Sequence, residues 1–162
     1  MNYDKKILTW DDVYKNIQNL VNEINNDKIK IDLLLPVIKG GFIPAMFIAK
    51  HIGIDKFSFI QARRSKSNLS NCDFGDAKFL GLLNKDAIKG VNVLIVEDIV
   101  YTGDTLKLVL NEIKKYSPKN IYICSMYSFY TSNDLGHIYK GNSNPNEVNW
   151  IVFPWDYEHP YK

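Results

Sequence analysis

The sequence predicts an α/β fold in which a mainly parallel sheet is flanked by helices. Apolar runs of strand length alternate with segments of helical periodicity, some of the runs are nearly continuous, and glycine turns follow two of them. Continuously apolar strands are typical of sheets that are covered on both faces. Strands that alternate with helices pair in parallel through right-handed crossovers, and such sheets bind ligands outside the carboxyl ends of their strands.

Length and composition indicate one domain, which we expect over residues 1–162. Hydrophobic residues make up 46% of the chain, which is enough to bury a substantial core without disulfides. The net charge is +2, from 20 Lys+Arg against 18 Asp+Glu, so no overall field favours nucleic acid as a partner. Any anion must therefore be bound by a local cluster of residues.

The sequence also predicts a cytoplasmic protein that associates with no membrane. Its two cysteines, Cys72 and Cys124, fit no metal-ligand spacing and are expected to stay reduced. The first residues show no apolar segment followed by a cleavage site, and no apolar run approaches the roughly 20 residues of a membrane span.

The first third of the chain predicts a helix, a strand and a second helix. Asp11 is a candidate cap for a helix whose apolar residues recur at helical spacing: Val13, Ile17, Leu20, Val21 and Ile24. Residues 31–38 predict a buried strand, which either is short or has Pro36 where no backbone donor is needed. Pro44 suits the first turn of a helix that runs to about His51.

The rest of the chain predicts further strands, one helix and two irregular segments. Residues 56–62 alternate like a strand, and the polar stretch after them indicates a flexible loop over about 63–80. A strand at 92–96 precedes a helix with apolar residues at helical spacing: Leu106, Val109, Leu110 and Ile113. Residues 120–129 predict another strand. A C-terminal segment over about 131–162 begins polar and ends in a short strand with an aromatic tail.

Glu97 and Asp98 come at the end of the strand at 92–96, and a Thr-Gly-Asp-Thr turn follows at 102–105. Adjacent carboxylates repel each other unless a diol, a cation or a bound Mg²⁺ satisfies them. The turn opens a helix, where unpaired N–H groups and the helix dipole favour an anion, above all a phosphate. Hydroxyls at one end and a phosphate at the other are the groups of a ribose 5-phosphate. Taken singly, a solvated strand end and an ordinary helix cap remain alternatives.

Two further groups of residues extend this prediction to a second anion. The first group follows the strand at 31–38 and consists of Lys39, Gly40 and Gly41. It offers one cation and backbone N–H groups, although Gly-Gly after a strand is commonly only a turn. The second group lies in the polar loop and consists of Arg63, Arg64 and Lys66. These cations either close over the same ligand and exclude water, or form a basic exposed loop.

Residues 93–106, VLIVEDIVYTGDTL, resemble the 5-phosphoribosyl-1-pyrophosphate (PRPP) signature of type I phosphoribosyltransferases. IKGGFIPAMFIAKHIGI at 38–54 resembles the pyrophosphate loop and following helix of that family. WIVFPWD at 150–156 resembles the base-binding tail of bacterial xanthine-guanine (6-oxopurine) enzymes. The resemblance covers nearly the whole chain and is weakest over 63–86. It implies the type I phosphoribosyltransferase fold, with a flexible loop and a short C-terminal base-binding hood.

The resemblance implies a role for each matched residue. Glu97 and Asp98 would bind the ribose 2- and 3-hydroxyls, directly or through Mg²⁺, and take part in catalysis. The 5-phosphate would be held by Thr102, Gly103, Asp104 and Thr105. Pyrophosphate would be bound by Lys39, Gly40, Gly41, Arg63 and Arg64. The base would contact Trp150, Ile151 and Tyr127.

The reaction implied by the resemblance is Mg²⁺-dependent transfer of 5-phosphoribose from PRPP to a purine base, with release of pyrophosphate, in nucleotide salvage. Members of this fold commonly pair subunits, so we expect a homodimer or homotetramer. The expected small-molecule partners are PRPP and a nucleobase, or a nucleoside monophosphate.

The acceptor side departs from the family pattern at two positions. Tyr101 stands where 6-oxopurine enzymes have an aspartate near the purine N7, and a tyrosine of reference pKa ~10 is a poor general base. In 6-oxopurine enzymes a lysine recognises the purine O6, and the matching position in this chain lies near Tyr127. No lysine lies between Asn120 and Lys140. The sequence therefore leaves two alternatives open: a phosphoribosyltransferase for a different base, or a catalytically weak regulatory protein that senses PRPP or nucleotides.

Overall fold

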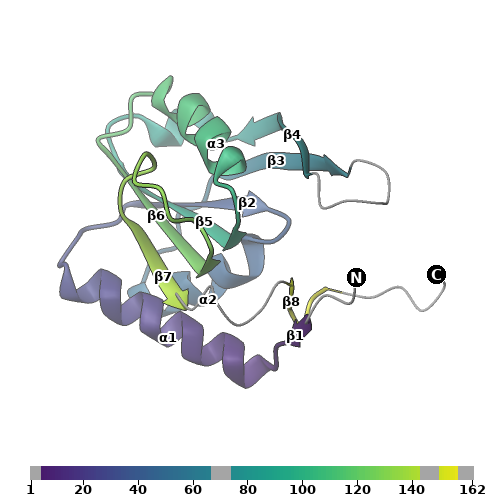
Figure 1. Cartoon of the computed structure of the whole chain (residues 1–162). Helices are drawn as coiled ribbons and strands as arrows, with labels where there is room; N and C mark the ends of the chain where they lie inside the picture. The colour runs from purple at the N-terminus through teal and green to yellow at the C-terminus, as the bar shows by residue number, and fades with distance from the viewer. Residues whose placement is uncertain (1–4, 67–73, 143–149, 157–162) are drawn as a thin grey trace.

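The computed structural model describes residues 5–66, 74–142 and 150–156. Its elements follow one another along the chain as Figure 1 labels them: β1 (Lys5–Ile7), α1 (Trp10–Asn26), β2 (Leu33–Ile38), α2 (Phe42–Ile52), β3 (Phe59–Lys66), β4 (Phe74–Leu83), the 3₁₀ helix η1 (Lys85–Ile88), β5 (Asn92–Val100), α3 (Asp104–Lys114), β6 (Asn120–Ser128), β7 (Ile138–Asn142) and β8 (Trp150–Val152). No described helix combines the length and the apolar character that crossing a membrane requires.

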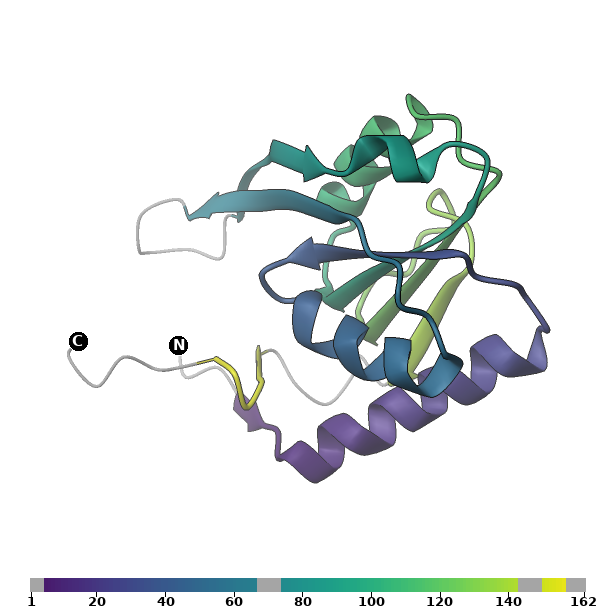
Figure 2. The same ribbon diagram turned by 180° about the vertical axis from the view of Figure 1, so that it is seen from behind.

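A six-stranded sheet in the order β4-β3-β2-β5-β6-β7 forms the centre of the molecule. All its neighbouring strands pair in parallel except β3 and β4, which are antiparallel. Helices α1 and α2 cover one face and α3 covers the other, as Figures 1 and 2 show from opposite sides. The predicted fold class, a mainly parallel sheet flanked by helices, is confirmed.

The two faces of the sheet explain why its central strands are apolar at every position. Leu34 and Leu94 point into the core beneath α1 and α2, whereas their neighbours Leu35 and Ile95 point into the core beneath α3. All four side chains are fully buried. Each such burial contributes about 1.5–3 kcal/mol, so these two strands form the rigid base from which the loops at their carboxyl ends project.

Pro36 lies inside β2 at a place where the strand lacks a full partner. Leu34 exchanges hydrogen bonds with Lys56 and Ser58 on the β3 side, and the paired register with β3 begins only at Val37. Hydrogen-bonding direction alternates along a strand, so the nitrogen of Pro36 faces that interruption. The missing N–H therefore removes no bond from the ladder with β5.

The expected cap of the first helix was wrong by two residues. Thr9, not Asp11, is the N-cap, and its hydroxyl accepts a hydrogen bond from the Asp12 backbone N–H. The Asp12 carboxylate accepts one in return from the Thr9 N–H at 2.9 Å. This reciprocal pair is a capping box closed by an aspartate, which is shorter than the usual glutamate.

The predicted flexible loop over 63–80 was wrong at both ends. Strand β3 continues through Lys66 and β4 begins at Phe74, and the two form an antiparallel ribbon that projects beyond the sheet (Figure 1). Backbone hydrogen bonds hold such a ribbon whatever the polarity of its side chains, so polar composition alone was a poor guide. Residues 67–73, in the middle of the expected loop, lie outside the described residues.

The predicted C-terminal hood over 131–162 divides into two parts. Strand β7 belongs to the main sheet, where it pairs with β6 and packs against α1. Only β8 stands apart, paired in parallel with β1 in a separate two-stranded sheet. The first part was missed because IYKGN is short and ends in polar residues, and its pairing with β6 is a tertiary contact that the sequence does not encode locally.

Candidate active site

The carboxyl ends of β2 and β5 meet at the centre of the sheet and bring two predicted groups into contact. A Cβ at Gly40 would lie 2.0 Å from the nearest carboxylate oxygen of Asp98, and one at Gly41 would lie 2.1 Å from the Val96 carbonyl. Only glycine fits at either position, because the turn passes directly over the end of β5. Lys39 is exposed at the start of this turn.

Glu97 and Asp98 lie inside β5, which runs four residues further than the predicted strand at 92–96. Glu97 is buried and pairs in register with Ser125 of β6, and Asp98 is half-buried. Among the residues that the structure describes, no lysine, arginine or histidine forms an ion pair with either carboxylate. Among the described residues, these two acids therefore have no cationic partner.

Burial is the main reason why both carboxyl groups hold their protons tightly. Burial, followed by the charge of Asp98, raises the pKa of Glu97 well above its ordinary value. Burial also raises the pKa of Asp98 to about 6, with a further contribution from the charge of Asp156. The Ile99 N–H donates to Asp98 at 2.7 Å, which favours the charged form but does not offset the burial.

The predicted phosphate turn caps α3 through a glycine. Gly103 is the N-cap with φ of 77°, and a Cβ there would lie 2.6 Å from the Tyr130 ring and 2.9 Å from Leu135. The Thr102 hydroxyl donates to the Asp104 carboxylate at 2.7 Å. The residues from Ile99 to Leu106, together with Glu97, line a cavity of about 100 Å³. A small anion in this cavity would lie at the N-terminus of α3, where backbone N–H groups and the helix dipole favour negative charge.

Tyr101 lies between the carboxylates and the hood. Its ring stacks on Phe129, with centroids 5.0 Å apart and planes at 4°. Burial raises the pKa of the Tyr101 phenol, a hydrogen bond from the Ile151 backbone acts against that rise, and the charges of Asp98 and Asp156 add to it. A phenol with a raised pKa stays protonated at neutral pH and does not serve as a general base.

The base-side residues are brought together only in part. Ile151 is buried in β8 and meets the Tyr101 hydroxyl. Tyr127 is 5% exposed and packs edge-on against Phe153 in the core, so Phe129 is the β6-side residue that faces Tyr101. The third predicted base residue, Trp150, begins β8, and its side chain lies outside the described part of the structure. The same holds for the side chains of Arg63 and Arg64 in β3, which were predicted to bind pyrophosphate.

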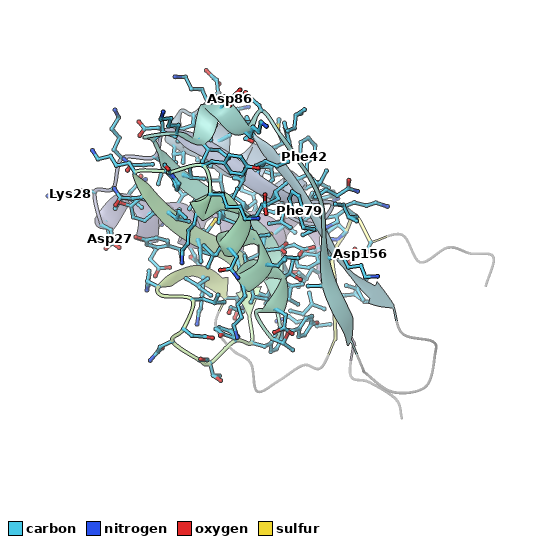
Figure 3. The ribbon with its side chains drawn as sticks, turned by 90° about the horizontal axis from the view of Figure 1, so that it is seen from above. Asp27, Lys28, Phe42, Phe79, Asp86 and Asp156 are labelled. Carbon is cyan, nitrogen blue, oxygen red and sulfur yellow. The ribbon has the colours of Figure 1, made fainter. Side chains whose placement is uncertain are left out.

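Asp156 is a site residue that the sequence reasoning missed. It follows β8 on the side of the molecule where β3 and β4 project (Figure 3), and its carboxylate accepts a hydrogen bond from the Phe153 N–H at 2.9 Å. Its charge acts on both Asp98 and Tyr101, which are more than fifty residues away in the sequence. The only signal was an acid that directly follows the aromatic tail FPW.

The raised pKa of Asp98 predicts a pH-dependent cost to folding. Its pKa is 3.8 when exposed and about 6 in the folded chain, so the folded state binds the extra proton and stability falls as pH rises between these values. Asp98→Asn removes this cost. We expect the variant to be more stable than the wild type at pH 7.5, by at most about 3 kcal/mol, and equally stable near pH 3.5.

Urea unfolding at the two pH values measures this difference. Asp86→Asn, at an exposed acid of η1, is the matched control and should leave stability unchanged at both. An Asp98→Asn variant that loses stability at pH 7.5 would contradict the assignment of a buried acid without a cation.

Comparisons with known proteins agree with this geometry. The phosphoribosyl transferase domain family matches residues 4–162. The human phosphoribosyltransferase domain-containing protein 1 is 32% identical over 140 residues, which cover 80% of this chain and 62% of that protein. The chain thus spans less than two thirds of this curated relative.

Solved structures extend the similarity over nearly the whole chain. A purine phosphoribosyltransferase from Pyrococcus horikoshii is 28% identical, covers 95% of both chains and superposes with a TM-score of 0.73. A hypothetical protein from Neisseria gonorrhoeae with bound ppGpp superposes with a TM-score of 0.81 over 98% of this chain and 92% of that one, and at 21% identity it supports the fold alone. From the family match and these likenesses, the chain belongs to the phosphoribosyltransferase family.

Proposed function

We propose that this chain transfers 5-phosphoribose from PRPP to a purine base and releases pyrophosphate. The observation that carries the proposal is the contact between Gly40 and the Asp98 carboxylate. This contact brings the turn at 39–41 to Asp98, and the cavity that Glu97 shares with residues 99–106 supports a site that also includes the phosphate turn at 102–105. PRPP has a pyrophosphate, a diol and a 5-phosphate, and these three groups of residues can each take one of them.

The phosphate turn would fix one end of the substrate. Backbone N–H groups at the start of α3 and the hydroxyls of Thr102 and Thr105 would donate to the 5-phosphate. Glu97 and Asp98 would accept hydrogen bonds from the ribose hydroxyls. Lys39 and the backbone of Gly40 and Gly41 would bind the pyrophosphate, which leaves from the anomeric carbon of the ribose.

Mg²⁺ fits this donor set as a partner of the substrate. Asp98 and Asp156 are oxygen donors, and the charge of Asp156 contributes to the raised pKa of Asp98, so a cation bound at these carboxylates would lower that pKa. Within the described residues, no three histidine, cysteine, aspartate or glutamate side chains are arranged to hold a metal by themselves. Mg²⁺ is commonly bound by one or two carboxylates together with substrate phosphates, so PRPP would complete the site. When bound, it would neutralise charge on the departing pyrophosphate.

The chain's own residues would act by position and charge. Bond cleavage at the anomeric carbon develops positive charge on the ribose ring, and ionised carboxylates beside the ring stabilise that charge. Fixing the phosphate and the diol at the same time aligns the ring for attack by the base nitrogen. The hood, with β8 against Tyr101, would cover the acceptor and exclude water.

The acceptor is proposed to be a purine because the Pyrococcus horikoshii relative is a purine phosphoribosyltransferase. Ile151 would offer its backbone to the edge of the base, and Trp150 would stack on its face. We still expect a cytoplasmic homodimer or homotetramer, as the sequence predicted.

A regulatory role is the second candidate. The stacked pair of Tyr101 and Phe129 provides neither a general base nor a cation beside the acceptor. In addition, the Neisseria gonorrhoeae protein of the same fold has bound ppGpp, a nucleotide. A chain that binds PRPP or a nucleotide without turning it over would satisfy both observations.

A panel of acceptors separates these two candidates. We expect pyrophosphate release when the protein is incubated with PRPP, Mg²⁺ and at least one of hypoxanthine, guanine, xanthine or adenine, since the site can align PRPP with a purine. Uracil and orotate serve as controls for base class. If no base gives turnover while PRPP or a nucleoside monophosphate still binds, the transferase proposal fails and the regulatory candidate stands.

Removing the acid pair tests the ribose assignment. Glu97→Gln combined with Asp98→Asn should weaken PRPP binding by roughly a hundredfold, because two charge-assisted hydrogen bonds are lost. Isothermal titration with PRPP and Mg²⁺ measures this affinity. Asp55→Asn combined with Asp86→Asn changes the net charge equally at exposed positions and should bind like the wild type. Equal PRPP affinity in the two double variants would refute the assignment.

A further inference from the structure

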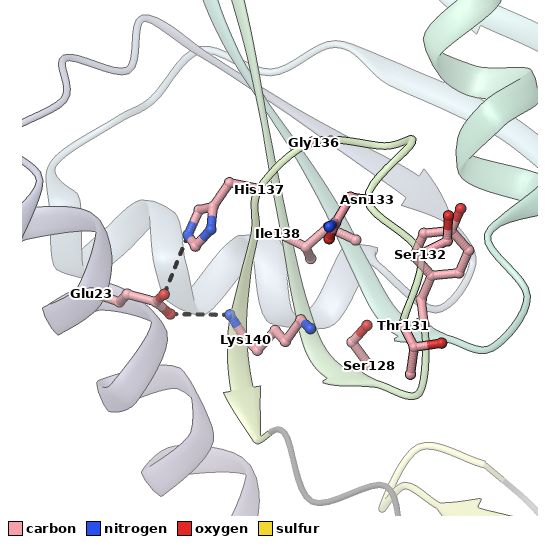
Figure 4. Close-up of a pocket in the computed structure, with 10 residues that line it drawn as sticks. Glu23, Ser128, Thr131, Ser132, Asn133, Gly136, His137, Ile138 and Lys140 are labelled. Atoms are coloured by element: carbon pink, nitrogen blue, oxygen red, sulfur yellow. Dashed lines mark hydrogen bonds and ion pairs between the residues drawn. The ribbon is translucent and has the colours of Figure 1, made fainter.

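A second and larger cavity lies at the far edge of the sheet. It has a volume of about 750 Å³ and is bounded by the C-terminal half of α1, the segment between β6 and β7, and β7 itself (Figure 4). Pockets that bind small molecules span about 300–1,000 Å³, so this cavity has the size for a metabolite. None of the residues assigned above to PRPP or to the base lines it, among those whose side chains are described.

One end of this cavity is rich in hydrogen-bond donors. Figure 4 shows the Lys140 side chain extended from β7 toward Ser128 and Thr131. No described carboxylate forms an ion pair with the Lys140 ammonium. The Ser128 hydroxyl is buried and has no hydrogen-bond partner among the described residues. A buried hydroxyl without a partner is costly, and a ligand oxygen at this position would satisfy it.

The acids near the cavity are already engaged. Glu23 lines the other end, where it lies 3.4 Å from His137 Nε2 and accepts the Lys140 backbone N–H at 3.1 Å. Asp134 belongs to the same segment but does not line the cavity, and it pairs with Lys107 of α3 at 2.8 Å. Neither carboxylate therefore neutralises the ammonium group at the Ser128 end.

We propose that this cavity is a second binding site, for a small phosphorylated molecule whose phosphate lies between Lys140, Ser128 and Thr131. A phosphate accepts hydrogen bonds from an ammonium and from hydroxyls, which are the groups that converge here. Glu23 and His137, at the other end, would meet the remainder of the ligand.

The second site shares a wall with the phosphate turn. Tyr130 lines the cavity, and its ring is also the nearest neighbour that a Cβ at Gly103 would meet. Tyr130 and Lys107 both bind Asp134, which ties the segment to the first turns of α3. An occupant of the cavity would thus contact the same segment that packs against the phosphate turn. If that turn holds the PRPP 5-phosphate, as the proposed function has it, the occupant is placed to act as an effector.

Amide NMR shifts with inorganic phosphate as the probe test the proposal. We expect two groups of amides to respond in the wild type, those of residues 102–105 and those of residues 131–140. Lys140→Gln should weaken the response of the second group by roughly tenfold or more and leave the first group unchanged. Lys50→Gln, at an exposed lysine of α2, is the matched control and should change neither.

Two further variants separate a lost contact from a lost fold. Lys140→Arg keeps the charge and should restore the response of residues 131–140, whereas Ser128→Ala keeps the charge but should weaken it. Sodium chloride at equal ionic strength should not reproduce the shifts. The second site is ruled out if residues 131–140 do not respond to phosphate, or respond equally in Lys140→Gln. A missing response at residues 102–105 alone would count against the proposed function instead.

Discussion

The burial of two adjacent carboxyl groups at the end of the central strand is the constraint on which the site depends. Burial opposes the ionised form of Glu97 and Asp98, and the charge of Asp156 raises the pKa of Asp98 further. Core strands β2 and β5 hold this arrangement rigidly, because their leucines and isoleucines are packed on both faces of the sheet. A cation bound beside these carboxyl groups would favour their ionised forms, and a diol would donate hydrogen bonds to them.

The site also requires the backbone to approach these acids closely, and glycine residues make this approach possible. The turn at 39–41 passes over Asp98 at a distance that admits no side chain, and Gly103 takes a left-handed conformation under the Tyr130 ring. Both turns lie at the carboxyl ends of parallel strands, where the fold exposes N–H groups. We propose that the acid pair and the two turns bind a ligand that carries a diol between two phosphate groups.

Local patterns were sufficient to predict the central strands, helices α1, α2 and α3, and the turn that opens α3. Features that depend on tertiary pairing were not predictable in this way: β3 ends in the polar residues 63–66, and β7 is short. Asp156 acts on Asp98 from the segment after β8, which pairs with β1 outside the main sheet. Phe129, which directly follows β6, stacks on Tyr101 in the place expected for Tyr127. The second cavity joins Glu23 to residues more than a hundred positions away, so no spacing in the sequence could indicate it.

We propose that one ligand spans the turn at 39–41, the acid pair and the phosphate turn. A crystal structure of the protein with PRPP and Mg²⁺ would test this. We expect the 5-phosphate at the N–H groups of residues 102–105, the ribose diol within hydrogen-bond distance of Glu97 and Asp98, and the pyrophosphate against Lys39 and Gly40. PRPP bound elsewhere, or bound with its diol turned away from both carboxylates, would overturn the proposal.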